Sequence, residues 1–153
     1  MKLLLTAELG RLVKWLRILG LDTAYFRGQN ASSLIIESLR QERIIVTRNR
    51  HLPKPTGARI VVIKADKLKE ELAATLKILQ IKPVSGMMFT RCILCNEPLV
   101  AAAKEKVKDR VPTYVFATQE KFVTCPACSR IYWQGTHWGN VEKLLKEIDG
   151  IYS

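Results

Sequence analysis

The sequence has no long apolar run, and it is poor in acidic and aromatic side chains. Only 14 of its 153 residues are Asp or Glu, and Trp, Tyr and Phe together make up 7%. A membrane span needs about 18–20 consecutive apolar residues, so an integral membrane protein is excluded. The apolar stretch at the N-terminus is too short for a signal peptide and is interrupted by Glu8. We therefore expect a soluble, cytoplasmic protein without a membrane partner.

The shortage of acids leaves a net charge of +11, because 25 residues are Lys or Arg. With 48% apolar residues the chain can bury a core, which argues against disorder. Residues 1–89 carry 16 basic and 7 acidic side chains, whereas residues 90–153 carry 9 and 7. This excess favours a polyanionic partner, with nucleic acid as the first candidate and an acidic membrane surface as the second.

The pattern divides the chain into two units, residues 1–82 and 88–153, joined by a Pro- and Gly-containing connector at 82–86. In the first unit, short apolar runs alternate with segments whose leucines recur every three or four residues. The runs predict strands at 3–5, 24–26, 44–47 and 60–63. The leucine segments predict helices at 9–19, 34–39 and 66–79, the last capped by Asp66, and a further helix capped by Asn140 near the chain end.

Strands that alternate with helices predict an α/β fold with a mostly parallel sheet covered on both faces. In such folds ligands bind beyond the carboxyl ends of the strands. Here those ends lie at Thr6 and its successors and at Thr47–Arg50.

The second unit holds two Cys-x-x-Cys pairs that are separated by 29 residues. The first pair is Cys92 and Cys95, and the second is Cys125 and Cys128. Two matched pairs favour a structural Zn²⁺ site, because one turn presents both sulfurs of a pair. A redox motif or buried free thiols are the alternatives, and a cytosolic setting disfavours disulfides. His137 is a possible substitute ligand, but four cysteines complete the shell, so we expect it to hydrogen-bond within an aromatic cluster.

Basic side chains in the first unit have two interpretations. Arg11, Lys14 and Arg17 advance by three residues along the first helix, away from its leucines, and such a stripe is either a solvated face or a phosphate-binding one. Arg48 and Arg50 follow a strand end, where this fold class binds ligands, which favours phosphate contact. Such contacts would make RNA affinity fall steeply with salt.

Several long motifs resemble the Mut-seven C-terminal RNase domain family. They are the segments 9–23 (LGRLVKWLRILGLDT), 43–48 (RIIVTR), 91–96 (RCILCN), 111–115 (VPTYV), 125–128 (CPAC) and 131–138 (IYWQGTHW). The resemblance covers nearly the whole chain. It implies a PIN-like three-layer α/β/α nuclease domain over 1–82 and a small zinc ribbon with a C-terminal helix over 88–153. It also implies a metal-dependent endoribonuclease, in which carboxylates at the sheet edge hold Mg²⁺ or Mn²⁺.

The sequence departs from the family pattern at the acidic positions. Thr6 stands where the first aspartate is expected. Asn49 replaces the aspartate of the family's Thr-Arg-Asp motif, and the segment 30–32 (NAS) replaces a third acid. Neutral oxygens cannot offset the charge of a hard dication. Of the acids that remain, Glu8 is the candidate to turn inward. We therefore expect a degenerate catalytic site at Thr6, Glu8 and Asn49, in a cleft that holds RNA but cuts it poorly or not at all.

Three functions follow from these observations. The chain is an active, metal-dependent ribonuclease, or a non-catalytic RNA-binding module, or a module that docks a protein partner through its zinc ribbon. The resemblance also allows a homodimer, because PIN-like domains often pair.

Overall fold

The computed structural model describes residues 1–134 and 136–152, and for 136–139 and 150–152 it describes the backbone only. The first sheet has the strand order β2-β1-β3-β4, and all its pairings are parallel. Its strands are β1 (Lys2–Thr6), β2 (Asp22–Phe26), β3 (Ile44–Thr47) and β4 (Ile60–Val62), and its helices are α1 (Gly10–Ile18), α2 (Ala31–Gln41) and α3 (Leu68–Ile78). The expected parallel α/β sheet is confirmed.

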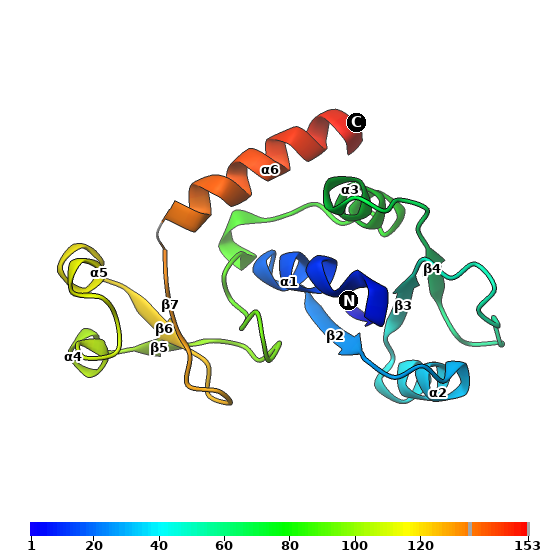
Figure 1. Cartoon of the computed structure of the whole chain (residues 1–153), viewed down its shortest axis with the longest axis horizontal. Coiled ribbons are helices and arrows are strands. Elements are labelled where there is room, and N and C mark those ends of the chain that lie inside the picture. Colours follow the sequence, from blue (N-terminus) through cyan, green and yellow to red (C-terminus); the bar gives the residue numbers. More distant parts are fainter. Residues whose placement is uncertain (135, 153) are drawn as a thin grey trace.

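Helices cover both faces of this sheet, so the unit has three layers (Figure 1). Successive side chains of a strand point to opposite faces. Leu3 and Leu5 accordingly pack with α1 and α3, whereas Leu4 packs with α2 on the other face. Complete burial of all three leucines explains why the sequence shows a continuous apolar run rather than an alternating one.

Glycine and capping residues next to the helices set several of the helix ends, but two of the predicted N-caps are wrong. Gly20 ends α1 with φ of 89°, and a Cβ there would lie 2.1 Å from the carbonyl oxygen of Met87. Asn30 caps α2 by accepting hydrogen bonds from two backbone N–H groups. The N-cap of α3, however, is Lys67 and not Asp66. Asn140 is not a cap either, because it lies inside α6 (Thr136–Tyr152).

The second sheet is antiparallel, with the order β5-β6-β7. Its strands are β5 (Val100–Ala102), β6 (Phe122–Thr124) and β7 (Ile131–Trp133). Two short helices, α4 (Lys104–Val107) and α5 (Thr113–Thr118), lie between β5 and β6. A small core forms from Val107, Val115 and Phe122, and the Phe122 ring meets Trp133 edge to face. We refer to this sheet and its two Cys-x-x-Cys turns as the ribbon.

Helix α6 leaves the ribbon and packs on α3 of the first unit (Figure 1). Val141, Leu144 and Ile148 are buried in the core that Leu72 and Leu76 of α3 also form. The sequence analysis assigns this helix to the second unit, but its apolar face belongs to the core of the first. Among the described residues, none of the helices combines the length and the apolarity that crossing a membrane requires.

Candidate functional site

The strand order places a topological switch point between β1 and β3. Strand β1 is followed by β2 on one side and pairs with β3 on the other, and ligands bind outside the carboxyl ends of strands at such a point. A pocket of roughly 280 Å³ lies there. Thr6, Glu8, Asn30, Thr47 and Asn49 are among the residues that line it. We call it the strand-end pocket, and it brings together the three positions where the sequence departs from the acidic pattern.

Glu8 turns into this pocket. Its Oε1 accepts hydrogen bonds from the hydroxyl of Thr6 at 2.6 Å, the hydroxyl of Thr47 at 3.2 Å and the backbone N–H of Arg48 at 3.1 Å. Burial opposes ionisation of this carboxyl, but the hydrogen bonds from Thr6 and the Arg48 N–H outweigh it and hold the Glu8 pKa below its usual range. One oxygen of the carboxylate therefore accepts hydrogen bonds from three donors of the protein itself, which stabilise its negative charge.

The side chains of the two asparagines in the pocket accept hydrogen bonds from backbone N–H groups. The side-chain oxygen of Asn49 accepts a hydrogen bond from the N–H of His51 at 3.0 Å, which is an Asx-turn. The side-chain oxygen of Asn30 accepts from the N–H groups of Ser32 and Ser33. The N-terminus of α2, with its partial positive charge, thus faces a pocket with few acids.

Glu71 is a second acid near this pocket that the sequence analysis does not identify. It lies in the first turn of α3, is only 4% exposed, and its Oε2 is 3.9 Å from Nε of Arg48. Burial raises the pKa of Glu71, while Arg48 and Arg11 act in the opposite direction. The burial of Glu71 could have been predicted from the sequence, because Glu71 falls on the apolar stripe that Leu68 and Leu72 define at helical spacing.

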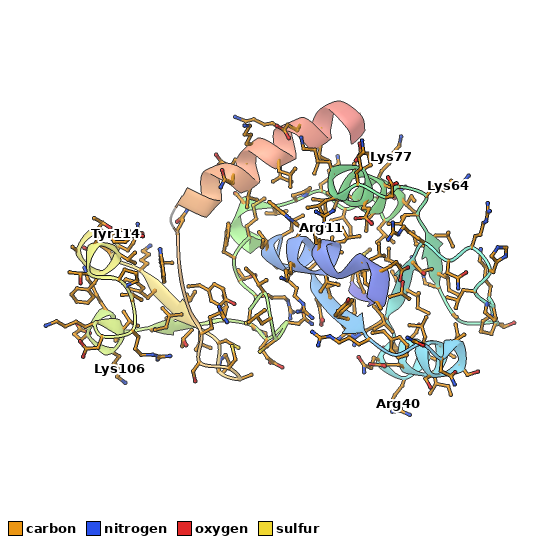
Figure 2. All side chains as sticks on the ribbon, in the orientation of Figure 1. Arg11, Arg40, Lys64, Lys77, Lys106 and Tyr114 are labelled. Atoms are coloured by element: carbon orange, nitrogen blue, oxygen red, sulfur yellow. The ribbon has the colours of Figure 1, made fainter. Side chains whose placement is uncertain are left out.

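The basic residues do not all gather at the strand ends. Arg50 is exposed there, and Arg48 is half-buried between Glu71 and the backbone carbonyl of Glu8. Arg11 and Lys14 are exposed on α1. Arg40 and Lys77 project from α2 and α3 on other faces of the unit, so the excess charge is not one patch (Figure 2). Arg27 was missed from the sequence; it follows β2 at the same edge and lies over the ring of Tyr25.

The position of Arg17 differs from the expected stripe of basic side chains, because Arg17 is not exposed. It is 8% exposed. Its Nε donates to the carbonyl of Thr23 at 2.9 Å, and its Nη1 donates to the carbonyl of Ile93 in the first Cys-x-x-Cys turn at 2.7 Å. The periodicity of α1 correctly placed Arg17 away from the leucines, but the ribbon covers that side of the helix.

Asn96, which follows the first cysteine pair, completes this contact. Its side-chain oxygen accepts from the N–H of Thr23 at 2.9 Å, and its amide donates to Asp22 Oδ1 at 2.7 Å. Arg43 donates to the same Asp22 oxygen at 2.8 Å. Burial works against the Asp22 carboxylate, yet Arg43 and Asn96 lower its pKa. The first cysteine turn is therefore docked on β2 by hydrogen bonds to charged groups.

The four cysteines converge in the ribbon. Their sulfurs all lie within 4.8 Å of one another, and Cys92 Sγ is 3.7 Å from Cys128 Sγ. Zinc–sulfur bonds of about 2.3 Å in a tetrahedron put the sulfurs roughly 3.8 Å apart. Cys92 and Cys125 are buried, and all four are free of disulfides. This cluster could hold a metal ion such as zinc.

The two cysteine turns share one backbone pattern. In the first, Cys92 N–H donates to Glu97 and Asn96 N–H donates to Cys92; in the second, Cys125 and Ser129 repeat both bonds. Asn96 and Ser129, each following the second cysteine of its pair, have φ of 66° and 64°. Identical turns bring the two sulfurs of each pair to the same side, which explains why the spacing alone predicts this cluster.

The Tyr132 hydroxyl supports the cluster from β7. Its oxygen lies 3.1 Å from Cys92 Sγ and accepts from the N–H of Ile93 at 3.2 Å. Burial disfavours the Cys92 thiolate, but hydrogen bonds from Tyr132 and from backbone N–H groups lower its pKa to about 7. A hydrogen bond with Cys128, together with burial and the nearby charge of Cys92, raises the pKa of Cys95 to about 12. A bound cation would favour the thiolate form of all four cysteines. The expected role of His137 falls on a side chain outside those described.

A divalent metal does not fit the strand-end pocket as it stands. Among the side chains that the structure describes, the cysteine cluster is the single group of three or more converging metal-binding residues. At the strand ends Glu8 is met by hydroxyl and amide groups, and Glu71 lies beside Arg48. Mg²⁺ needs more anionic oxygen than this arrangement offers.

The fold and the site together define a class: a three-layer α/β domain with a parallel sheet and a strand-end pocket, which carries a four-cysteine ribbon. The chain belongs to the Mut7-C RNAse domain family, whose model matches residues 1–145. The resemblance seen in the sequence is thereby confirmed, and it favours a nuclease-like function. No curated protein and no solved structure matches the chain significantly.

Proposed function

We propose that this protein binds RNA at the strand-end pocket but cuts it poorly or not at all. The family favours RNA as the partner, and Arg27 follows β2 while Arg48 and Arg50 follow β3, two strands that end at the same edge of the sheet. The partial positive charge at the N-terminus of α2 also favours a phosphate in this pocket. These features bind a phosphate backbone without reading base sequence.

One observation carries the catalytic part of the proposal: three protein donors hold the single inward carboxylate oxygen of Glu8. A metal-dependent nuclease needs several carboxylates that are free to take a cation. Here Thr6 donates a hydrogen bond to Glu8, whereas an aspartate there would add a second negative charge. The pocket satisfies its own acid, and the loss of acids also lowers repulsion of the incoming phosphate.

We also propose that the cysteine cluster holds a structural Zn²⁺ through Cys92, Cys95, Cys125 and Cys128. Four protein ligands leave no open position, which is typical of a structural site rather than a catalytic one. Bound zinc would supply folding energy to the ribbon, whose own buried core consists of three side chains.

The catalytic proposal is tested by incubating zinc-loaded protein with a generic single-stranded RNA and Mn²⁺. We expect no Mn²⁺-dependent cleavage by wild type, and cleavage by the double variant Thr6→Asp/Asn49→Asp. Asn49→Asp preserves the side-chain oxygen that caps the turn to His51. Wild-type cleavage that both EDTA and Glu8→Gln abolish would overturn the degenerate-site proposal.

RNA binding itself is tested by fluorescence anisotropy in a salt series without divalent metal. Affinity should fall with a log–log slope of about −0.7 for each contacted phosphate of a single strand. Arg50→Ala should reduce both the affinity and the slope, whereas Arg40→Ala on α2 serves as the matched control. Affinity that does not respond to salt would remove the nucleic-acid function.

A further inference from the structure

A second pocket lies where the ribbon meets the first unit, apart from the strand-end pocket. It has a volume of roughly 370 Å³ and lies between α1, Phe89, β7 and α6. Four aromatic side chains line it: Trp15, Phe89, Tyr132 and Trp133. Because aromatic residues are scarce in this chain, their meeting from three separate segments calls for an explanation. We call it the aromatic pocket.

Each aromatic ring is anchored on one side and half-exposed on the other. Trp15 and Phe89 pack against the core of the first unit, and Trp133 packs against the ribbon core. Tyr132 is fixed through its hydroxyl, which accepts from the Ile93 N–H. Rings that are already held lose little conformational freedom when a ligand stacks on them. The pocket is therefore a preformed set of stacking surfaces.

The segment after the connector is held in place at Phe89, beside these rings. Phe89 has φ of 59°, a conformation that costs a non-glycine residue about 1–2 kcal/mol. Its N–H donates to the carbonyl of Ile18, near the end of α1, at 2.8 Å. This bond fixes Phe89 against α1 and keeps the aromatic pocket in one shape.

The polar groups of the aromatic pocket suit a nucleotide. Arg130 and Asn140 line it and are exposed, so they offer a guanidinium for a phosphate and a carboxamide for a base edge. No carboxylate is present among the described lining residues. The neighbouring groove along α1 and α3 differs, because Asp66, Glu70 and Glu147 line it beside its basic residues.

We propose that the aromatic pocket takes an unpaired base of the RNA strand, stacked on its rings. The inference rests on the proposed RNA binding and adds a second point of contact to it. Aromatic stacking contributes about 1–3 kcal/mol per base and tolerates any base, because every base has a π-face. The ribbon would then bind the RNA together with the first unit. The hydrogen bonds of Arg17 and Asn96 would fix the position of the ribbon relative to the first unit.

The test compares a fluorescein-labelled 12-nucleotide oligouridylate with a strand of the same length and charge in which alternate bases are absent. Wild type should bind the complete strand about tenfold more tightly and show quenching of its tryptophan fluorescence with that strand. Trp15→Leu should lose this preference. Tyr114→Leu is the matched control, because Tyr114 is 72% exposed on α5 at the end of the ribbon away from α1 (Figure 2).

The possible outcomes separate this inference from the proposed function. Equal, salt-dependent affinity of wild type for the two strands would overturn the base site and leave phosphate binding intact. Binding of neither strand would remove both. Equal affinity together with a concentration-dependent dimer that Trp15→Leu dissociates would show that a second copy of the chain occupies the pocket, which also overturns the inference. The fluorescence quenching of wild type needs no variant and decides the case if Trp15→Leu does not fold.

Discussion

In the ribbon, four cysteine sulfurs converge within 4.8 Å of one another. At the strand ends of the first sheet, one carboxylate lies among hydroxyl, amide and backbone N–H groups. Both regions are places where the resemblance implies a metal, yet among the described side chains only those of the ribbon form a full set of ligands. The scaffold around the strand-end pocket keeps the switch point and the buried strands, while Thr6 and Asn49 occupy two positions where the resemblance implies acids.

The contrast has a physical reason. The close approach of the four cysteines of the ribbon raises the pKa of Cys95, and a bound cation would favour the thiolate form of all four. Glu8, in contrast, has its negative charge stabilised by Thr6 and Arg48, and its pKa is lowered accordingly. A bound cation would therefore stabilise the ribbon, whereas the charge of Glu8 is already stabilised by donors of the protein itself.

The largest expected effect is loss of the ribbon fold on removal of its metal. Chelation or Cys92→Ser should unfold the ribbon, because structural zinc contributes an apparent 10 kcal/mol or more. Amide hydrogen exchange should show β5 to β7 losing protection, while β1 and β3 keep theirs. Leu94→Ser, an exposed change between the first two cysteines, is the control. Unchanged protection of the β6 amides after complete metal removal would contradict the prediction that the ribbon needs a metal to fold.

Removing Arg17 should uncouple the two regions. Arg17→Met leaves the carbonyls of Thr23 and Ile93 without their donor, and we expect a loss of about 2–4 kcal/mol in the free energy of unfolding. Lys14→Met, at an exposed position on the same helix, should change it by less than about 0.5 kcal/mol. Chemical denaturation of both variants measures the difference, and equal effects would show that Arg17 does not hold the ribbon.

Glu8→Gln should tighten RNA binding in the absence of divalent metal. The substitution removes a negative charge from the strand-end pocket, and we expect a gain in affinity of up to about fivefold. Glu37→Gln, an acid of the same unit that does not line the pocket, is the control for net charge. Anisotropy titrations at constant ionic strength provide the measurement. A loss of affinity would indicate that Glu8 takes part in binding rather than opposing it.

The smallest expected effect is on the pH dependence of stability. Asp22 has a lowered pKa in the folded state, so it stabilises the fold above its ordinary pKa, and this contribution is lost as the pH falls through the lowered value. Between pH 5 and pH 3 the melting temperature of wild type should therefore fall more steeply than that of Asp22→Asn. Parallel curves would show that Asp22 does not dock the ribbon through its charge.

The strands and the cysteine cluster could be predicted because both depend on local patterns. The apolar run at residues 44–47 suits a buried parallel strand wherever it lies in the sheet. Each Cys-x-x-Cys turn positions its sulfurs through bonds within six residues. The pairing of the two turns then needs only the short strands between them.

The burial of Glu71 and Arg17 depends on contacts distant in sequence. Arg17 meets Ile93, which is 76 residues away, and no periodicity of α1 indicates that the ribbon covers that side. Glu71 is buried because α3 packs over the strand ends. The start of α6 was missed for a different reason, since Asn140 is a good cap by type but the helix already begins at Thr136.

The most direct test of the central claim is a Mn²⁺ titration of the zinc-loaded protein by calorimetry. Wild type should take up no Mn²⁺ at millimolar concentration, and Thr6→Asp/Asn49→Asp should bind Mn²⁺ at the strand-end pocket, because it restores anionic oxygen there. Stoichiometric Mn²⁺ binding by wild type that Glu8→Gln abolishes would contradict the account, since the pocket would then be a working metal site.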